Sequence, residues 1–252
     1  MAMSSQLGFS TSINDLAREY AASVRGKTIL ITGVTAKSIG AAFVLGIAAT
    51  SPKLIILAGR TKAKVEQTGK DLEAAHPTIP WRLLELDLAD QDQIRRAAGE
   101  VVRYEEIIDV LVLNAGVMST PWSTTKQGIE MQFGVNHVRY FLFANLIIPK
   151  ILKSPAPRVV LTTSDGHRLS PIRFYDHNFD NGKTYNSWYA YGQSKTANML
   201  YARSLAAKLP SLLVFSHHPG VINTELMQHM NDNDFPGSDR HGPRAGLVDV
   251  LG

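Results

Sequence analysis

Two side chains able to exchange protons, Tyr191 and Lys195, stand four residues apart in a segment compatible with a helix. At this spacing they share one helix face, with Cβ atoms about 5–6 Å apart. A free phenol has a pKa of about 10, and a nearby ammonium lowers that pKa by favouring the phenolate. The pair therefore predicts a general acid/base, although a Tyr–Lys pair on the surface of a helix would show the same spacing.

Ser164 supports the catalytic interpretation of this pair. It follows an apolar, β-branched run, Val159–Thr162, that predicts a strand. Open α/β sheets bind their ligands at the carboxyl ends of the strands. We therefore expect Ser164 to lie at the same edge of the sheet as a nucleotide site, together with Tyr191 and Lys195.

A glycine-containing loop leaves the first predicted strand and enters an apolar helix. Glycines in such a turn let the backbone approach a pyrophosphate, which backbone N–H groups and the helix dipole then stabilise. A tight turn without a ligand is the alternative. The loop residues expected to contact a nucleotide cofactor are Thr32, Gly33, Thr35, Lys37, Ser38, Ile39 and Gly40.

Arg60 ends the second predicted strand, at the position that faces the adenosine ribose in dinucleotide folds. Guanidinium groups pair strongly with phosphates, so Arg60 and Lys37 favour NADP(H), with NAD(H) as the alternative. A solvated arginine at a helix start would look the same. Asp87 ends the third strand. In a competing interpretation, Asp87 is a helix N-cap near Asp90. The further residues expected at the cofactor are Leu88, Asn114, Ala115 and Gly116.

The elements that must position these residues follow a regular alternation. Short apolar runs at 28–31, 54–57, 81–86, 110–113, 159–162 and 212–215 predict six strands, and stretches such as 65–75 and 91–102 predict helices between them. Apolar strands that alternate with helices form parallel sheets covered on both faces. The predicted fold is a single α/β domain, a three-layer Rossmann-type doubly wound parallel sheet.

The chain ends differ from this core. Ile13, Leu16, Tyr20 and Val24 recur at helical spacing behind Ser12, which predicts a short capped amphipathic helix within an N-terminal extension, residues 1–26. The catalytic domain is expected over residues 27–230. Residues 231–252 are rich in Asn, Asp, Gly and Pro near their start, and an irregular, shortened tail is expected there.

Composition excludes several classes of protein. The 252 residues contain no cysteine, which rules out disulfides, thiolate nucleophiles and Cys-ligated metals. The net charge of +4 comes from scattered side chains, so no nucleic-acid partner is expected. No apolar run reaches the ~18–20 residues of a membrane span, and the N-terminus does not resemble a signal peptide, so we expect a cytoplasmic protein. His217 and His218 are adjacent and point to opposite faces of an extended chain, so no metal is expected. A homo-oligomer is compatible with the sequence.

Taken together, these motifs resemble the short-chain dehydrogenase/reductase superfamily, and most of all its branch of retinol-dehydrogenase-like and WW-domain-oxidoreductase-like enzymes. The resemblance runs from Lys27 to about Met227. It rests on the order and spacing of Thr32–Gly40, Asn114–Gly116, Asn136, Ser164, Tyr191–Lys195 and His218–Gly220.

The resemblance implies a role for each residue. Ser164 would hydrogen-bond the substrate oxygen, Tyr191 would exchange its proton, and Lys195 would also hold the nicotinamide ribose. Asn136 would order a water that relays protons, unless it serves only as a helix kink or an interior hydrogen bond. The residues implied at the nicotinamide carboxamide are Pro219, Gly220, Ile222 and Thr224.

Three features depart from the family pattern. The glycine loop has one extra residue and carries Ser38 where the family usually has a glycine, so its Cβ would crowd a phosphate or its hydroxyl would bind one. Ser164 and Tyr191 are 27 positions apart, a longer spacing than in most members, and the intervening aromatic stretch 173–188 is expected to wall the substrate pocket. The family's substrate lid and seventh strand are not evident after the sixth strand.

These observations predict an NADP(H)-dependent oxidoreductase. It would interconvert an alcohol with an aldehyde or ketone on a hydrophobic small molecule, such as a lipid, a retinoid or a secondary metabolite, and act in a cell as a carbonyl reductase. The alternative is a truncated or catalytically silent relative that binds NADP and has a regulatory role or none.

Overall fold

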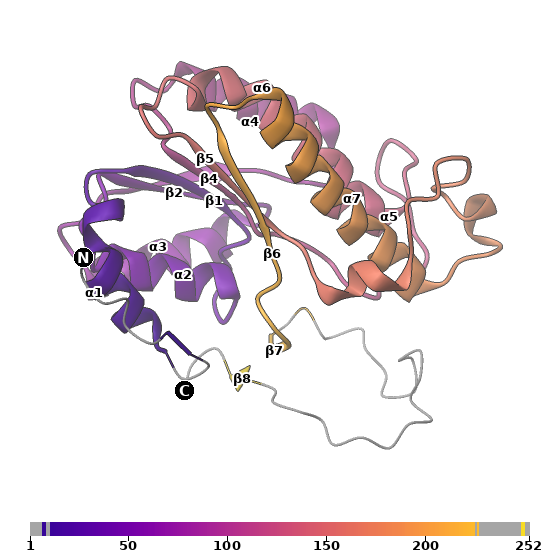
Figure 1. Cartoon of the computed structure of the whole chain (residues 1–252), viewed down its shortest axis with the longest axis horizontal. Coiled ribbons are helices and arrows are strands. Elements are labelled where there is room, and N and C mark those ends of the chain that lie inside the picture. The colour runs from indigo at the N-terminus through magenta and orange to yellow at the C-terminus, as the bar shows by residue number, and fades with distance from the viewer. Residues whose placement is uncertain (1–6, 9–10, 225, 227–247, 250–252) are drawn as a thin grey trace.

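The computed structural model describes residues 7–8, 11–224, 226 and 248–249. Its main feature is a sheet of six parallel strands in the order β3-β2-β1-β4-β5-β6 (Figure 1). The strands are β1 (Thr28–Thr32), β2 (Leu54–Gly59), β3 (Trp81–Glu85), β4 (Val110–Leu113), β5 (Arg158–Thr162) and β6 (Leu213–His217). Two short strands, β7 (Ile222–Asn223) and β8 (Val248–Asp249), pair with each other apart from this sheet.

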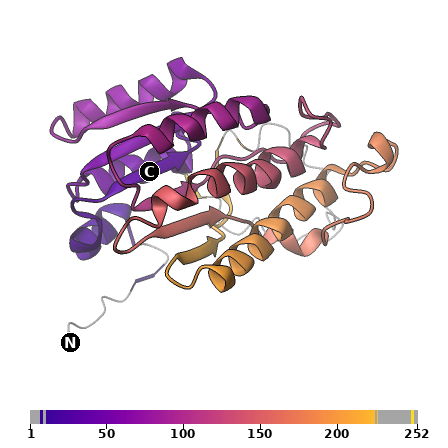
Figure 2. The ribbon, with the colours of Figure 1, turned by 90° about the horizontal axis from the view of Figure 1, so that it is seen from above.

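Helices cover both faces of the sheet. One layer holds α1 (Ile13–Val24), α2 (Ile39–Ala48) and α3 (Lys62–Ala75), and the other holds α4 (Gln91–Arg103), α6 (Arg139–Ile151) and α7 (Ser187–Lys208). Figure 2 looks onto the second layer, where α4, α6 and α7 run side by side. Shorter elements connect them: α5 (Met131–Phe133), the π-helical segment η1 (Gly134–Val138), and the 3₁₀ turns η2 (Asp165–Leu169) and η3 (Asp180–Gly182).

The central strands β1, β2 and β4 are mostly apolar and almost wholly buried, because helices cover both of their faces, whereas the edge strands β3 and β6 carry polar side chains and are more exposed. Along β1, Leu30 packs with the cluster under α4, α6 and α7, whereas Ile29 and Ile31 pack with the cluster under α2 and α3. Successive side chains of a strand point to opposite faces, so β1 contributes to both cores. All five strand pairings of the large sheet are parallel, which brings the carboxyl ends of the strands to one edge.

The predicted doubly wound sheet is confirmed. The strand order reverses direction between β1 and β4, and this is the point at which such folds bind their ligands. The predicted N-terminal helix is α1, where Ser12 and Asp15 form a capping box. The π-helical segment was not predicted. The tail expected over 231–252 lies outside the described residues, apart from β8.

Candidate active site

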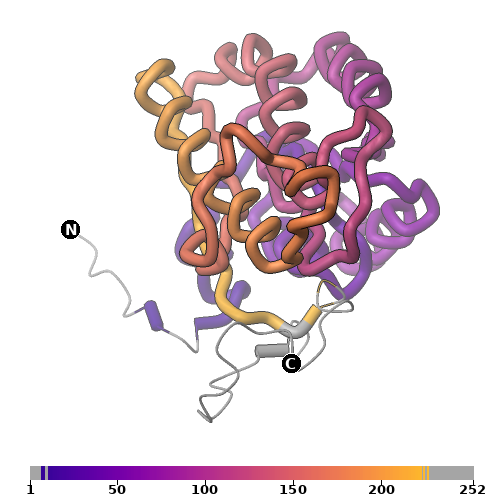
Figure 3. The backbone as a smooth tube through the Cα atoms, turned by 90° about the vertical axis from the view of Figure 1, so that its right-hand side faces the viewer, coloured from indigo at the N-terminus to yellow at the C-terminus, as the bar shows by residue number. Residues whose placement is uncertain are grey.

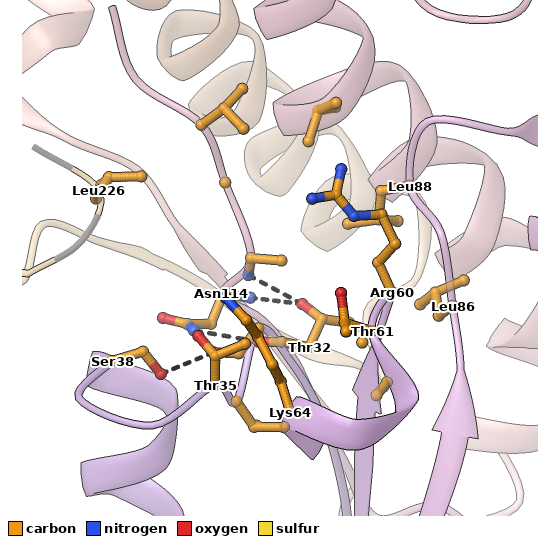
Figure 4. Close-up of a pocket in the computed structure, with 18 of the residues that line it drawn as sticks. Thr32, Thr35, Ser38, Arg60, Thr61, Lys64, Leu86, Leu88, Asn114 and Leu226 are labelled. Carbon is orange, nitrogen blue, oxygen red and sulfur yellow. Dashed lines mark hydrogen bonds between the residues drawn. The ribbon is translucent and has the colours of Figure 1, made fainter. Parts of the chain in front are cut away.

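A pocket of about 420 Å³ opens at the carboxyl ends of β1 to β4 (Figure 4). It is lined by most of the residues predicted to contact a cofactor: Thr32, Gly33, Thr35, Lys37, Ser38, Ile39, Arg60, Asp87, Leu88, Asn114, Ala115, Gly116 and Thr224. The other residues predicted at the cofactor are not among the lining residues: Gly40, Tyr191, Lys195, Pro219, Gly220 and Ile222. Residues predicted from the glycine-containing loop, from strand ends and from the family resemblance thus share one pocket.

Close packing accounts for the glycines of the loop. Gly33 has a φ of +75°, and a Cβ on it would lie 2.6 Å from the Ala115 Cα. A Cβ on Gly40 would collide with the carbonyl oxygen of Gly33, so Gly40 holds α2 against the loop instead of lining the pocket. Both positions require glycine for the backbone to pack this tightly.

Ser38 neither crowds the loop nor leaves its hydroxyl free. Its side chain is the N-cap of α2, where Oγ accepts a hydrogen bond from the Ala41 N–H at 3.1 Å and donates one to the Gly33 carbonyl at 3.2 Å. A capping serine satisfies an N–H group that the first helical turn leaves unpaired. The departure from the family pattern at this position thus has a structural reason.

Asn114 and Thr32 fix the floor of the pocket. The Asn114 Nδ2 donates to the carbonyl oxygens of Thr32 and Gly33 at 3.1 and 3.0 Å. The Thr32 Oγ1 accepts from the backbone N–H groups of Asn114 and Ala115 at 3.0 and 3.1 Å. These bonds, drawn in Figure 4, tie the end of β1 to the end of β4.

Basic side chains dominate one rim of the pocket. Lys37, Arg60 and Lys64 line it, and none of the three has an ion-pair partner among the described residues. The N-cap of α4 is Asp90. Asp87 instead lines the pocket, and its Oδ1 accepts a hydrogen bond from the Ala89 N–H at 2.7 Å. The competing interpretation of Asp87 as the helix N-cap is therefore wrong.

The predicted catalytic residues gather beside this pocket. Tyr191 and Lys195 lie on α7, and the Lys195 Nζ is 5.4 Å from the centre of the Tyr191 ring. Ser164 is the N-cap of η2, two residues before Gly166. A Cβ on Gly166 would lie 2.7 Å from the Tyr191 ring and 3.4 Å from the Ser164 Oγ. A Cβ on Gly116, which lines the pocket, would lie 3.7 Å from the Lys195 Nζ. Lys195 thus lies between the predicted catalytic residues and the pocket.

Burial controls the ionisation of this pair. Tyr191 and Lys195 are only 5% and 4% exposed. Burial raises the pKa of Tyr191, and a side-chain hydrogen bond with Ser164 acts in the opposite direction. Burial also lowers the pKa of Lys195 to about 8. The prediction of a lowered pKa for Tyr191 is therefore wrong in this state, because enclosure disfavours the charged form of each group.

The lowered pKa of Lys195 predicts a pH-dependent stability. Below pH 8 the folded and unfolded chains both hold the proton, and the folded chain bears the cost of the buried charge. Between pH 8 and about 10.4, the pKa of a free lysine, the folded chain releases its proton first, so its free energy of unfolding rises. The free energy of unfolding, measured with urea at pH 7.5 and 9.5, should therefore rise by about 1–3 kcal/mol less in Lys195→Met than in the wild type. Equal pH dependence in the two proteins would contradict the lowered pKa.

Asn136 is fully buried in the π-helical segment. Its Oδ1 accepts from the Val117 N–H at 2.8 Å, and its Nδ2 donates to the Val117 carbonyl at 2.9 Å and to the Ser194 Oγ at 3.0 Å. The side chain therefore forms the interior hydrogen bonds of the alternative interpretation. The implied role in ordering a water stays a prediction.

The segment 173–188 does not place its aromatic side chains as expected (Figure 3 views the molecule from this side). Phe174 and Tyr175 are exposed, whereas Phe179 is buried against Tyr185 of the loop. Trp188, on α7, is buried with its ring edge-on to that of Tyr191. Arg173 organises the loop, since its guanidinium pairs with Asp176 at 2.7 Å and stacks on the Phe179 ring at 4.6 Å. Phe174 and Tyr175 therefore face solvent, no residue of 173–188 lines the pocket at the strand ends, and the expected substrate wall stays a prediction.

Several pocket residues were missed in the sequence. Thr61 and Lys64 line the pocket and lie within four residues after Arg60. The basic residues of the run 60–64 could have indicated them. Val117, Met118 and Leu226 also line it, but apolar side chains of these types carry no distinguishing pattern. The adjacent histidines have separate contacts: His217 Nε2 lies 3.1 Å from the Thr162 Oγ1, and His218 Nε2 lies 3.7 Å from an Asp165 carboxylate oxygen.

Neither a membrane-spanning helix nor a cluster suited to a metal ion occurs in the described part of the chain. None of its helices is both long and apolar enough to cross a membrane. The same residues contain no group of three or more His, Asp or Glu side chains that could hold a metal ion.

Comparison with known proteins gives the family. Residues 27–174 match the family model described as short chain dehydrogenase. The chain is 39% identical over 210 residues to retinol dehydrogenase 13 of Homo sapiens, a match that covers 82% of this chain and 62% of that protein. It thus spans slightly less than two thirds of the length of this relative.

Solved structures share the fold. An uncharacterized protein from Mycobacterium paratuberculosis is 30% identical with a TM-score of 0.67, covering 86% of this chain and 82% of that chain. A short chain dehydrogenase from Escherichia coli CFT073, solved with NADPH, is 23% identical with a TM-score of 0.66 and covers 82% of each chain, a likeness that shows the fold alone. Because it matches both the family model and the retinol dehydrogenases, the chain belongs to the short chain dehydrogenase family, in its retinol-dehydrogenase-like branch.

Proposed function

We propose that this protein is an NADP(H)-dependent oxidoreductase that interconverts an alcohol and a carbonyl group, with Tyr191 as its general acid/base. The observation that carries the proposal is the position of Lys195. Its Nζ lies beside Gly116 on the wall of the pocket and 5.4 Å from the centre of the Tyr191 ring. A proton-exchanging group therefore stands at the rim of a pocket suited to a dinucleotide.

The pocket fits such a cofactor. Gly33, Gly116 and Ser38, the N-cap of α2, line it, and the start of a helix favours a bound phosphate through its backbone N–H groups and its dipole. Arg60, Lys37 and Lys64 supply the positive charge that a 2′-phosphate requires. When bound, the nicotinamide supplies or accepts the hydride.

The chain's own residues would handle the proton. Because burial raises the pKa of Tyr191, its phenol is protonated at neutral pH. A protonated phenol is the acid that carbonyl reduction needs, since the oxygen of the new alcohol must gain a proton. Ser164, which hydrogen-bonds Tyr191, would hold the same oxygen. The protonated phenol thus matches the proton that carbonyl reduction consumes.

We further propose a hydrophobic aldehyde or ketone as the substrate, of retinoid, lipid or secondary-metabolite type, and a cytoplasmic location. The names of the retinol dehydrogenases support the substrate class, and a chain without cysteine is compatible with the reducing cytoplasm.

NADPH oxidation in the presence of a panel of hydrophobic aldehydes and ketones, including retinal, tests the proposal. We expect turnover with at least one member of the panel, and less with NADH than with NADPH. Binding of NADPH, measured by its fluorescence, with no turnover across the panel would instead identify a protein that binds the cofactor without catalysing the reaction.

A further inference from the structure

One buried amide, that of Gln132 on α5, has all of its hydrogen-bonding groups engaged. The side chain is fully buried. Its Oε1 accepts from the Ser119 N–H at 2.9 Å, and its Nε2 donates to the Ser187 carbonyl at 2.8 Å and to the Tyr185 hydroxyl at 2.9 Å. Such a network is costly to leave half made, so it specifies one arrangement of the segments that it joins.

Those segments carry the two halves of the site. Ser119 belongs to the β4 loop (residues 114–120), whose earlier residues line the cofactor pocket. Ser187 is the first residue of α7, the helix of Tyr191 and Lys195. In an α-helix the carbonyl of residue 187 accepts the N–H of residue 191. Gln132 is therefore bonded to the same carbonyl as the backbone of Tyr191.

Asn136 repeats the pattern four residues later. It holds Val117 of the β4 loop through both backbone groups and holds Ser194 of α7 through its hydroxyl. Gln132 and Asn136 thus each bridge the β4 loop to α7. Their partners on α7, Ser187 and Ser194, lie on either side of Tyr191 in the sequence. A direct hydroxyl contact, Ser119 Oγ to Ser187 Oγ at 3.0 Å, reinforces the first bridge.

Ser119 needs such a hold. Its φ is +49°, in the left-handed region that residues with a side chain rarely adopt. Strained backbone persists where the surroundings over-determine it. The bonds from Gln132 and Ser187 supply that restraint and keep the β4 loop at its present distance from α7.

We propose that Gln132 is a positioning residue for the reaction: through the Ser187 carbonyl and Ser119 it sets the place of Tyr191 relative to the cofactor wall. The inference rests on the proposed function of Tyr191 as acid/base. It predicts that loss of the Gln132 amide lowers kcat much more than it weakens NADPH binding, because Arg60 and the glycine loop lie on other elements.

Gln132→Met removes three side-chain hydrogen bonds at little change in volume. We expect kcat to fall about 10-fold or more, since small displacements of catalytic groups are expensive, with the NADPH dissociation constant changed by less than about threefold. Asp109→Leu is the matched control. It also removes buried hydrogen bonds, to Thr28 and Ser154, but at the amino end of the sheet. An equal loss of kcat in both variants would reduce Gln132 to a structural role and overturn the proposal.

Gln132→Glu gives a test that does not depend on Gln132→Met folding. A protonated glutamic acid can accept from Ser119 and donate to the Ser187 carbonyl, whereas a carboxylate would face that carbonyl as a second acceptor. The neighbouring ionisable groups are Glu130 and Tyr185. We expect kcat of the variant, relative to the wild type, to rise about fivefold or more as the pH falls from 8 to 5.5. A ratio that does not change with pH would contradict the proposal.

Amide hydrogen exchange separates this inference from the proposed function. In Gln132→Met, exchange should accelerate in residues 117–120 and 187–191 and stay unchanged in β4, whether or not a substrate is known. If exchange accelerates in Gln132→Met while the wild-type protein shows no activity, the proposed function is removed and the bridge remains. Unchanged exchange at both segments would overturn the bridge itself.

Discussion

Tyr191→Phe is expected to reduce kcat for carbonyl reduction by about 10²–10⁴-fold, the usual contribution of a positioned acid or base. The ring keeps its packing, including its edge contact with Trp188, and loses only the hydroxyl that exchanges the proton. NADPH binding should persist, because Tyr191 does not line the cofactor pocket. Steady-state NADPH oxidation and equilibrium NADPH binding measure the two quantities separately.

Tyr189→Phe is the matched control for this change. Tyr189 precedes Tyr191 by two residues on the same helix but is 47% exposed. It should keep near wild-type kcat. Near-normal reduction by Tyr191→Phe would show that another group supplies the proton, and a parallel loss in both variants would point to damage of α7.

The fold was predictable because each strand carries its own signal. Runs such as Leu54–Leu57 are apolar at every position, and strands buried on both faces need that pattern. The glycine-containing loop and the strand ends then indicated the pocket, since Arg60 and Asn114 directly follow β2 and β4, and Asp87 lies two residues beyond β3. Neither inference required knowledge of long-range contacts.

Features that depend on tertiary contacts were not predictable. The pKa of Tyr191 follows from enclosure by η2 and α7, which the spacing to Lys195 does not reveal. The outward direction of Phe174 and Tyr175 depends on the local pairing of Arg173 with Asp176. Gln132 bridges segments 13 and 55 residues away, so nothing in its sequence neighbourhood marks it.

The strongest cofactor test concerns Arg60. Arg60 lines the pocket just beyond β2, and Figure 4 shows it near Leu86 and Leu88. A bidentate bond between a guanidinium and a phosphate contributes about 1.5–3 kcal/mol, and an aspartate in its place adds repulsion of the 2′-phosphate. Arg60→Asp should therefore shift the ratio of NADPH to NADH affinity toward NADH by about 10²-fold or more.

Lys62→Asp changes the net charge equally, two residues away, and so controls for long-range attraction. Lys62 does not line the pocket; its ammonium pairs with Glu66 at 3.7 Å along α3. Long-range attraction would weaken NADPH modestly in both variants and would fade with added salt, because exposed charges are screened beyond about 10 Å at 0.1 M. A direct bond to the 2′-phosphate would appear only in Arg60→Asp and would spare NADH. Equal shifts in both variants would remove Arg60 as the determinant of cofactor choice.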